Sequence, residues 1–224
     1  SVFLAELMVE TGERMGKSMV ALITDMDQPL GRYVGNALEV VEVLEVLRDE
    51  GPHDLRELCL ELSAWMFQLG GATHTIAEGK ALAGELIRSG KALDKFREMV
   101  KLQGGDVNAI DHPEKLPRAK HTLEVLSTKS GFVTAIECEA VGTACVVLGG
   151  GRERKEDAVD PSVGIVLHRK VGDPISAGES LCTVHYNSNG LGARAKDILL
   201  RSYHIADVPP AKHRALIHRV IHGS

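Results

Sequence analysis

The sequence predicts an α/β region followed by an α+β region: a helix-rich domain with one buried strand, then a β-rich C-terminal domain. Over the first hundred residues most apolar side chains recur at helical spacing. The exception is the short apolar run SMVALITDM, residues 18–26, which is typical of a buried strand. Beyond residue 120 the apolar runs are short, rich in β-branched residues and separated by glycines, as strands are.

Composition narrows the classes of function. Of the 224 residues, 44% are hydrophobic and 25% charged, close to ordinary globular usage, and only 4% are aromatic. A net charge of -5 argues against a nucleic-acid partner. No apolar run approaches the roughly 18 residues of a membrane span, and the first residues lack the features of a signal peptide. We therefore expect a cytoplasmic protein with a small-molecule or protein partner, no membrane contact and four reduced cysteines.

The first elements alternate between helix and strand. FLAELMVETGERMG is periodic at helical spacing and ends at Gly16. The helical pattern starts within the first few residues, so the chain is expected to begin inside a domain. The buried strand follows, then a loop, and Asn36 is the expected N-cap of a helix that Gly51 and Pro52 end.

Three more helices complete the first region. Asp54 is the expected cap of a helix with one continuous apolar stripe, made of Leu55, Leu58, Cys59, Leu62, Trp65, Met66 and Leu69. Thr75 and Glu78 have the spacing of a capping box for a helix that reaches about Ser89. A last helix runs through four apolar positions and stops at Gly104 and Gly105; these positions are Leu93, Phe96, Met99 and Val100.

A polar segment with two prolines, DHPEKLPRAK, is the best linker candidate. The predicted organisation is therefore a first domain at residues 1–110, a linker at 111–120 and a β-rich domain at 121–224. Within the second domain the segment AVGTACVVLGGG is expected to form a small buried helix, and the expected strands are TLEVLS, FVTAIE, VGIVLHRKV and SLCTVHY.

Glu39, Glu42 and Glu45 recur every three residues along one side of the helix after Asn36. Such a stripe is usually a solvated acidic face. Alternatively, one of the carboxylates joins carbonyl oxygens of the preceding loop QPLGRY, residues 28–33, around a hard cation, which prefers oxygen ligands. Periodicity does not choose between the two.

Other candidates have simpler explanations. GGGRERKED, residues 149–157, could bind phosphate through exposed N–H groups, but it lacks the P-loop pattern, and Glu153, Glu156 and Asp157 would repel an anion; a mixed-charge turn fits better. His218 and His222 have the i, i+4 spacing of metal ligands without the glutamate of an HExxH motif, and RALIHRVIHG fits a closing strand equally well.

No Ser, His and Asp constellation is visible in the sequence, so no catalytic residue and no substrate-binding residue is predicted. The remaining histidines of the second region are expected to be packed or exposed rather than catalytic; they are His168, His185 and His204.

Two blocks, TDMDQPLGRYVGNALEVVEVL and GGGRERKEDAVDPSVGIVLHRKVGDPISAGE, closely resemble the pyrimidine nucleoside phosphorylases, the family of thymidine phosphorylase, and the similarity covers the whole chain. The resemblance implies a pentosyltransferase that cleaves a pyrimidine nucleoside, thymidine or uridine, with inorganic phosphate as co-substrate. The products are the free base and a pentose 1-phosphate, and the complete enzyme is expected to be a homodimer.

The resemblance also implies that the phosphate-binding and base-binding segments belong to a preceding half. This chain is then similar to the second part of the α/β domain joined to the C-terminal domain, and it is expected to be inactive alone. An apolar surface that the other half covers is expected to be exposed on it.

The functional positions that the resemblance carries onto this chain form a site for a monovalent cation, potassium. Its ligands would be the main-chain oxygens of Leu30 and Tyr33 and the carboxylate of Glu42. Family members often have a small residue where this chain has Tyr33, so the loop is expected to differ in shape. The cation and its loop are expected to steady a phosphate-binding loop of the other half.

Two other functions remain open. The segment GIVLHRKVGDPISAGESLCTVH also resembles the strand-turn-strand pattern of biotinyl and lipoyl carrier domains, with Lys170 as the modified residue. It lacks the flanking methionines of biotin carriers, and residues 171–173 fit a simple turn. The other alternative is a non-catalytic interaction domain.

Overall fold

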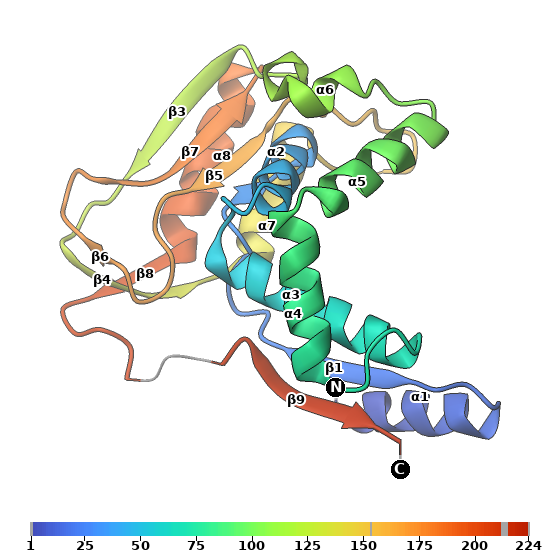
Figure 1. The fold of residues 1–224 in the computed structure, drawn as a ribbon. Helices are drawn as coiled ribbons and strands as arrows, with labels where there is room; N and C mark the ends of the chain where they lie inside the picture. Colours follow the sequence, from blue (N-terminus) through green and yellow to red (C-terminus); the bar gives the residue numbers. More distant parts are fainter. Residues whose placement is uncertain (1, 153, 212–214, 224) are drawn as a thin grey trace. The chain divides into compact units, whose positions relative to one another are not determined.

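The computed structural model describes residues 2–152, 154–211 and 215–223 (Figure 1). The chain forms two compact units that alternate along the sequence. The first unit comprises Ser1–Asp25, Val46–Asp94 and Arg214–Ser224, and the second comprises Met26–Glu45 and Lys95–His213. This division differs from the single boundary predicted at residues 111–120, and the domain boundaries stay a prediction. The predicted fold class, α/β followed by a β-rich region, is confirmed.

The first unit contains a two-stranded antiparallel sheet within its described residues. Strand β1 (Val20–Thr24) pairs with β9 (Ile217–His222), and Val20 lies opposite His222. Helix α1 (Val2–Arg14) ends before Gly16, as predicted. The prediction of a buried β1 is wrong, because every residue of this strand is half-buried. A sheet of two strands covers its members less than a larger sheet with both faces covered.

Helices α3 (His53–Leu69) and α4 (Ile76–Arg88) pack against each other in the same unit. The predicted capping box is present: the Thr75 hydroxyl accepts from the Glu78 N–H, and the Glu78 carboxylate accepts from the Thr75 N–H. The two backbones approach closely where Gly79 meets Ala64, since a Cβ on Gly79 would lie 2.8 Å from Ala64 Cα. Asp54 lies in the first turn of α3, whose N-cap is Pro52 rather than Asp54.

The apolar residues predicted to form a stripe on α3 do not form a closed core. Met66 is 64% exposed and Leu62 40%, whereas Glu61 and Ala64 are buried. Glu61 accepts from the Trp65 indole N–H at 3.0 Å and pairs with Lys80 of α4. Helix α3 therefore packs on α4 through small and polar residues, because that face allows the close approach at Gly79.

The second unit contains two sheets and most of the remaining helices. Its four-stranded sheet has the order β2-β5-β7-β3, and its three-stranded sheet the order β6-β4-β8. The strands are β2 (Tyr33–Val34), β3 (His121–Leu126), β4 (Gly131–Ile136), β5 (Gly164–Leu167), β6 (Pro174–Ile175), β7 (Ser180–Tyr186) and β8 (Tyr203–Ala206). The helices are α2 (Asn36–Leu47), α5 (Lys91–Leu102), α6 (Asn108–Asp111), the 3-10 turn Pro113–Lys115, α7 (Cys138–Leu148) and α8 (Asn189–Ser202).

Most of these elements were predicted. The four expected strands correspond to β3, β4, β5 and β7, and the expected small buried helix is α7. Asn36, predicted as an N-cap, is the first residue of α2, and its side-chain amide donates to the Gly150 carbonyl oxygen at 2.9 Å. Within the described residues no helix is long and apolar enough to cross a membrane.

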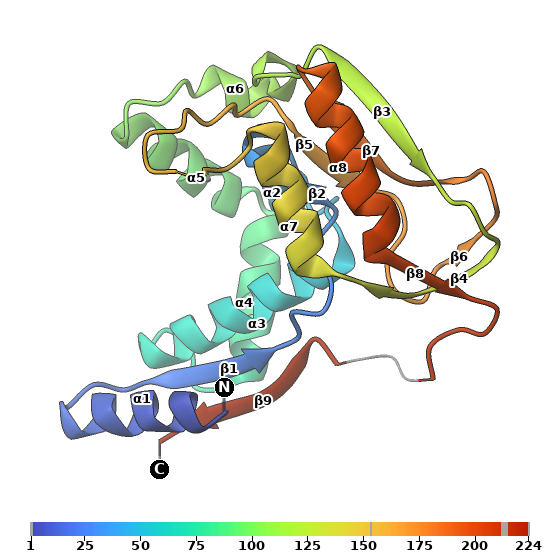
Figure 2. The ribbon, with the colours of Figure 1, turned by 180° about the vertical axis from the view of Figure 1, so that it is seen from behind.

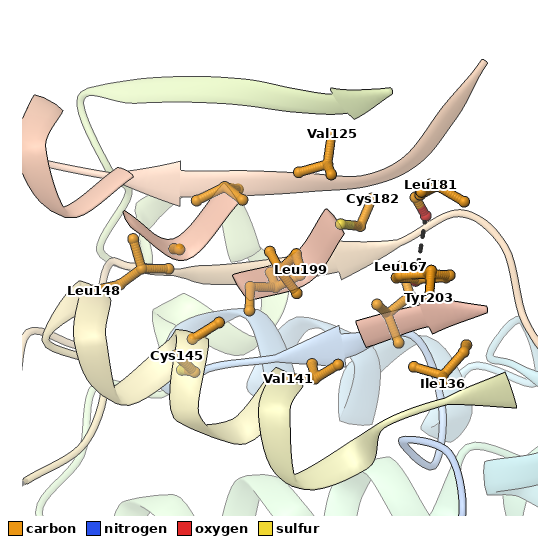
Figure 3. Close-up of a cluster of buried hydrophobic side chains, with 14 of the residues drawn as sticks. Val125, Ile136, Val141, Cys145, Leu148, Leu167, Leu181, Cys182, Leu199 and Tyr203 are labelled. Atoms are coloured by element: carbon orange, nitrogen blue, oxygen red, sulfur yellow. Dashed lines mark hydrogen bonds between the residues drawn. The ribbon is translucent and has the colours of Figure 1, made fainter. Parts of the chain in front are cut away.

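The core of the second unit lies between the four-stranded sheet and helices α7 and α8 (Figures 2 and 3). The two helices run side by side over β5 and β7, and their apolar side chains meet those of the sheet. Leu199, Leu167 and Val125 are fully buried there. The Tyr203 hydroxyl at the edge of this core donates to the Arg169 carbonyl oxygen at 3.3 Å, and burial raises the pKa of this phenol.

Candidate cation-binding loop

The loop of residues 28–33 leads into β2 and then into α2. Its fold depends on Gly31, which is buried and has a left-handed φ of +67°. A Cβ at this position would lie 2.3 Å from Glu42 Oε2, so the loop backbone packs directly on the carboxylate. Only glycine allows both the conformation and this approach.

The three glutamates of α2 all contact the segment that precedes the helix. Glu42 Oε1 accepts from the Arg32 N–H at 2.6 Å, Glu39 Oε1 from the Gly35 N–H at 3.0 Å, and Glu45 Oε1 from the Tyr33 hydroxyl at 3.2 Å. Glu42 is only 3% exposed. The interpretation of this stripe as a solvated face is therefore wrong for Glu42, because its spacing serves to bind the turn before the helix.

Tyr33 is held by the same arrangement. Burial raises the pKa of its phenol, and the negative charge of Glu45, together with the hydrogen bond to it, raises the pKa further. Tyr33 therefore acts as a neutral donor to Glu45 near neutral pH. Its hydroxyl makes a hydrogen bond that a small side chain at this position could not make.

A second segment holds the loop from β5 and the turn after it. The Lys170 ammonium donates to the Pro29 and Gly31 carbonyl oxygens, at 2.6 Å for the latter. The Val171 N–H donates to Gln28 Oε1 at 3.0 Å, and the Leu167 N–H donates to the Arg32 carbonyl oxygen at 2.7 Å. The loop is thus tied both to α2 and to residues 167–171.

The arrangement fits a cation with oxygen ligands. The Leu167–Arg32 bond sets the register of β2 and β5, in which Tyr33 lies opposite Val166. In an antiparallel ladder the carbonyls of successive residues point to opposite sides, so the Tyr33 carbonyl turns away from β5. Leu30 precedes Gly31 in the same loop, and Gly31 packs on the Glu42 carboxylate. One carboxylate with main-chain carbonyls is a donor set that suits a hard cation of low charge.

The predicted cation would be held mainly by carbonyl oxygens rather than by a cluster of side chains. Among the residues that the structure describes, no group of three or more His, Cys, Asp or Glu residues could hold a metal ion. The assignment of Leu30, Tyr33 and Glu42 as ligands stays a prediction.

Comparison with known proteins gives the family. Residues 132–206 match the pyrimidine nucleoside phosphorylase C-terminal domain, and residues 2–93 match the a/b domain of a glycosyl transferase family. Pyrimidine-nucleoside phosphorylases of Staphylococcus aureus strains USA300, NCTC 8325 / PS 47 and COL are each 46% identical over 220 residues. The chain belongs to the pyrimidine nucleoside phosphorylase family. The match covers 97% of this chain but 50% of each relative, so the chain spans about half the length of these curated relatives.

The glycine-rich segment, residues 149–157, contains a turn in the part that the structure describes. Gly149 is the left-handed C-cap of α7, and the Arg154 N–H donates to Asp157 Oδ2 at 2.8 Å. Asp157 is therefore bound to the turn itself, which agrees with the mixed-charge interpretation. Glu153, one of the acidic residues in that argument, lies outside the described residues.

The paired histidines near the C-terminus lie in strand β9, so the helical metal site is wrong and the closing strand is correct. His218 Nε2 lies 3.6 Å from Asp25 Oδ1, and the His222 ring centroid lies 5.8 Å from that of Trp65. Arg214, the first residue of the predicted segment, lies outside the described residues.

The histidines of the second unit bind neighbouring side chains. His168 Nε2 lies 2.7 Å from the Thr183 hydroxyl, and His204 Nε2 lies 2.8 Å from Glu137 Oε1. Burial lowers the pKa of His185. His168 and His204 are thus held by neighbouring side chains, and the expectation that none of the three histidines is catalytic stays a prediction.

The contacts of Lys170 and of the Val171 N–H with the loop were not predicted. Lys170 was considered only as a carrier lysine, although it and the loop belong to the two blocks that carry the family resemblance. The presence of both blocks in one sequence was the available signal for a contact between them. It did not specify which side chains make that contact.

Proposed function

We propose that this chain is the C-terminal portion of a pyrimidine nucleoside phosphorylase, which converts thymidine or uridine and inorganic phosphate to the free base and a pentose 1-phosphate. The observation that carries the proposal is the 46% identity to enzymes of that name along 97% of the chain. The reaction is a pentosyl transfer. It requires groups that position phosphate and stabilise the leaving base.

In this proposal the chain supplies a scaffold rather than the reacting groups. No catalytic or substrate-binding residue is assigned to it. The groups for phosphate and base belong to a half that the relatives possess beyond the matched region, since the match covers 50% of their length. The chain alone is accordingly inactive, and the preference between thymidine and uridine is set outside it.

The contribution of this chain is the cation-binding loop. The main-chain oxygens of Leu30 and Tyr33 and the carboxylate of Glu42 would hold a monovalent cation such as potassium, which would supply positive charge to this loop. Glu42 already fixes the Arg32 N–H, and Gly31 keeps the backbone against the carboxylate. A loop fixed in this way can hold a neighbouring phosphate-binding segment in one geometry.

The test is phosphate-dependent release of thymine from thymidine and uracil from uridine. The 224-residue chain, the complete product of its gene, and this chain joined to the matching N-terminal half of the USA300 relative are assayed in parallel. Activity in the completed proteins and none in the chain alone is expected. Phosphorolysis by the chain alone would overturn the assignment of the reacting groups to another half. No activity in any of the three would overturn the proposed reaction.

The cation requirement is tested in the complete enzyme with Glu42→Gln, which keeps size and removes charge. Glu42→Gln should lower the affinity for potassium by about tenfold or more, because a charged ligand and a charge-assisted bond are lost together. Glu45→Gln is the matched control, since Glu45 bonds a side chain of the loop rather than its backbone. The measurement is activity against potassium concentration. An equal response of both variants would argue against Glu42 as a ligand.

A homodimer is proposed for the complete enzyme. Exposed apolar side chains on α1 and α3 support the proposal that further polypeptide covers these helices. Phe3 is 78% exposed and Met66 64%, and α1 exposes further large apolar side chains, namely Leu4, Leu7 and Met8. Light scattering of the complete enzyme checks the dimer. A monodisperse 224-residue monomer that binds no hydrophobic dye would contradict the exposed apolar surface.

The carrier alternative is less well supported than the phosphorylase. Lys170 would have to present a free amino group for lipoyl or biotinyl attachment, whereas its ammonium binds the Pro29 and Gly31 carbonyl oxygens. Intact mass of the protein purified from its own organism distinguishes the two, because either attachment adds a covalent increment.

A further inference from the structure

Lys170 places a charged group at the loop that carries the proposed cation site. An ammonium has three donors and no acceptor, so it must be satisfied by oxygen atoms when it leaves water. Two of the oxygens are the main-chain carbonyls of Pro29 and Gly31, which flank Leu30 in the sequence. Hydrogen bonds from a charged donor are stronger than those between neutral groups. The half-buried Lys170 therefore holds two points of one short loop.

Gly31 connects this lysine to Glu42. Its carbonyl oxygen accepts from Lys170, and its Cα packs on the Glu42 carboxylate so closely that no Cβ fits. The next residue, Arg32, donates its N–H to the same carboxylate. A displacement of Gly31 that follows loss of the lysine would consequently move the backbone away from Glu42.

We propose that Lys170 is a positioning residue of the cation site: a built-in cation that holds the loop closed on Glu42 and so lowers the concentration of external monovalent cation that the site needs. The proposal rests on the cation site of the proposed function. Its physical basis is preorganisation, because the lysine orders the loop carbonyls before the external cation arrives.

The opposite effect is also physically reasonable, and it gives the test its direction. Lys170 and an external cation carry like charges, and like charges repel at short distance. If repulsion dominates, removal of the lysine lowers the potassium concentration that the enzyme requires. If preorganisation dominates, removal raises it. The sign of the change decides between the two.

The first experiment uses the complete enzyme and the variant Lys170→Ala. The potassium concentration for half-maximal phosphorolysis is expected to rise by about tenfold to a hundredfold, as loss of charge-assisted hydrogen bonds implies. Saturating potassium should restore the maximal rate. Ammonium or methylammonium ions, which replace the missing group in the space left by the side chain, should restore the response to potassium. A lower or unchanged potassium requirement, or no response to these amines, would overturn the proposal.

Two matched variants exclude general effects. Gln28→Ala removes a hydrogen bond between neutral groups of the same two segments, the one from the Val171 N–H to the Gln28 side chain. Because no charged group is lost, ammonium ions should not rescue this variant. Lys129→Ala removes an exposed lysine from the turn between β3 and β4 and should leave the potassium response unchanged. Rescue of Gln28→Ala by ammonium would show that the amine acts elsewhere and would overturn the proposal.

The second experiment does not depend on activity, so its result separates this inference from the proposed reaction. In the 224-residue chain the Arg32 amide, which donates to Glu42, reports on loop closure through hydrogen exchange. Lys170→Ala should speed its exchange by about tenfold. Ammonium chloride should slow the exchange again, whereas tetramethylammonium, which has no N–H donor, should not. Unchanged exchange of this amide would overturn the proposal even if the enzyme is active.

Loss of folding in the alanine variant would not leave the question open. Lys170→Gln keeps a polar donor on a shorter stem without the charge, and circular dichroism identifies which variant is folded. The folded variant is then compared with the unaltered chain by exchange of the Arg32 amide. The same increase is expected, and its absence in a folded Lys170→Gln would count against the lysine as a positioning residue.

Discussion

The two compact units of this chain differ in how they bury apolar side chains. All of the largest fully buried side chains, among them Leu44, Ile165 and Leu199, belong to the second unit. The first unit buries mostly small residues such as Ala64 and Ala83, although both units expose large apolar side chains, for example Phe3 in the first and Leu102 in the second. The second unit therefore has a closed core between sheet and helices, whereas the first is held by close backbone approach and polar contacts.

The difference teaches that a regular helix does not require a closed core around it. The α3–α4 pair is specified by a capping box, by the approach at Gly79 and by the Glu61–Lys80 pair. Burial of apolar area contributes about 25 cal/mol per Å², so a unit that leaves such side chains in water has stabilisation still to gain from a covering surface. The predictions below test this contrast.

The largest effect is expected from a cavity in the second unit. Leu199→Ala removes a fully buried side chain of α8 and should lower the free energy of unfolding by about 2–5 kcal/mol. Met66→Ala is the matched change on the exposed face of α3 and should alter it by less than about 0.5 kcal/mol. Urea unfolding of the 224-residue chain measures both. Equal losses would contradict the contrast between the units.

Thiol reactivity should report on how closed the core of the second unit is. Burial raises the pKa of Cys182 to about 12 and of Cys145 to about 11, and both thiols are buried in the second unit. Cys59 of α3 is only half-buried, and burial raises its pKa as well. Since the thiolate is the reactive form, iodoacetamide should label Cys59 well before Cys145 and Cys182.

Peptide mapping over time in native buffer gives the order of labelling, and the unfolded protein gives the intrinsic rates as a control. Early labelling of Cys182 in the native chain would show that the core of the second unit opens readily.

A smaller effect is expected at the helix cap of the first unit. Thr75→Ala removes the acceptor for the Glu78 N–H and should cost about 1 kcal/mol. Thr11→Ala is the control, because Thr11 lies on the exposed side of α1 and its hydroxyl only donates back to the Leu7 carbonyl oxygen. Thermal unfolding followed by helical circular dichroism compares them. A loss in Thr11→Ala as large as in Thr75→Ala would mean that capping does not stabilise this unit.

The sequence predicted those parts of the fold that local chemistry determines. The capping box of Thr75 and Glu78 and the end of α1 before Gly16 depend on neighbouring residues, and both were correct. The apolar stripe of α3 was predicted correctly as a pattern, but Leu62, Met66 and Leu69 are exposed, because periodicity shows which residues are apolar and not whether anything covers them. The burial of β1 was overestimated for the same reason.

The site shows a similar limit. The spacing of the three glutamates put them on one side of α2, but the spacing could not show that they turn back to bind residues 32–35. Lys170 reaches the loop across more than a hundred residues of sequence. Such a contact follows from the pairing of β2 with β5, which no local pattern specifies.

The smallest expected effects concern pH and two side chains of the four-stranded sheet. Burial lowers the pKa of His185 below its usual 6.5, so the folded state favours the neutral ring. The stability that this provides is complete above pH 6.5 and is lost as the pH falls through the lowered value. Hydrogen bonds from Ser180 and Thr183 lower the pKa of Glu124 below its usual 4.5, so its contribution is complete above pH 4.5 and is lost on further acidification.

Two variants separate the pH ranges in which His185 and Glu124 affect stability. His185→Asn should remove the loss of stability that begins below pH 6.5, and Glu124→Gln should remove the loss that begins below pH 4.5, with a small amplitude because Glu124 is exposed. Urea midpoints at pH 7.5, 5.5 and 4 measure both. A pH dependence that stays unchanged in both variants would show that groups other than His185 and Glu124 carry it, such as Asp160 or Glu78, whose carboxyl pKa values are also lowered by hydrogen bonds.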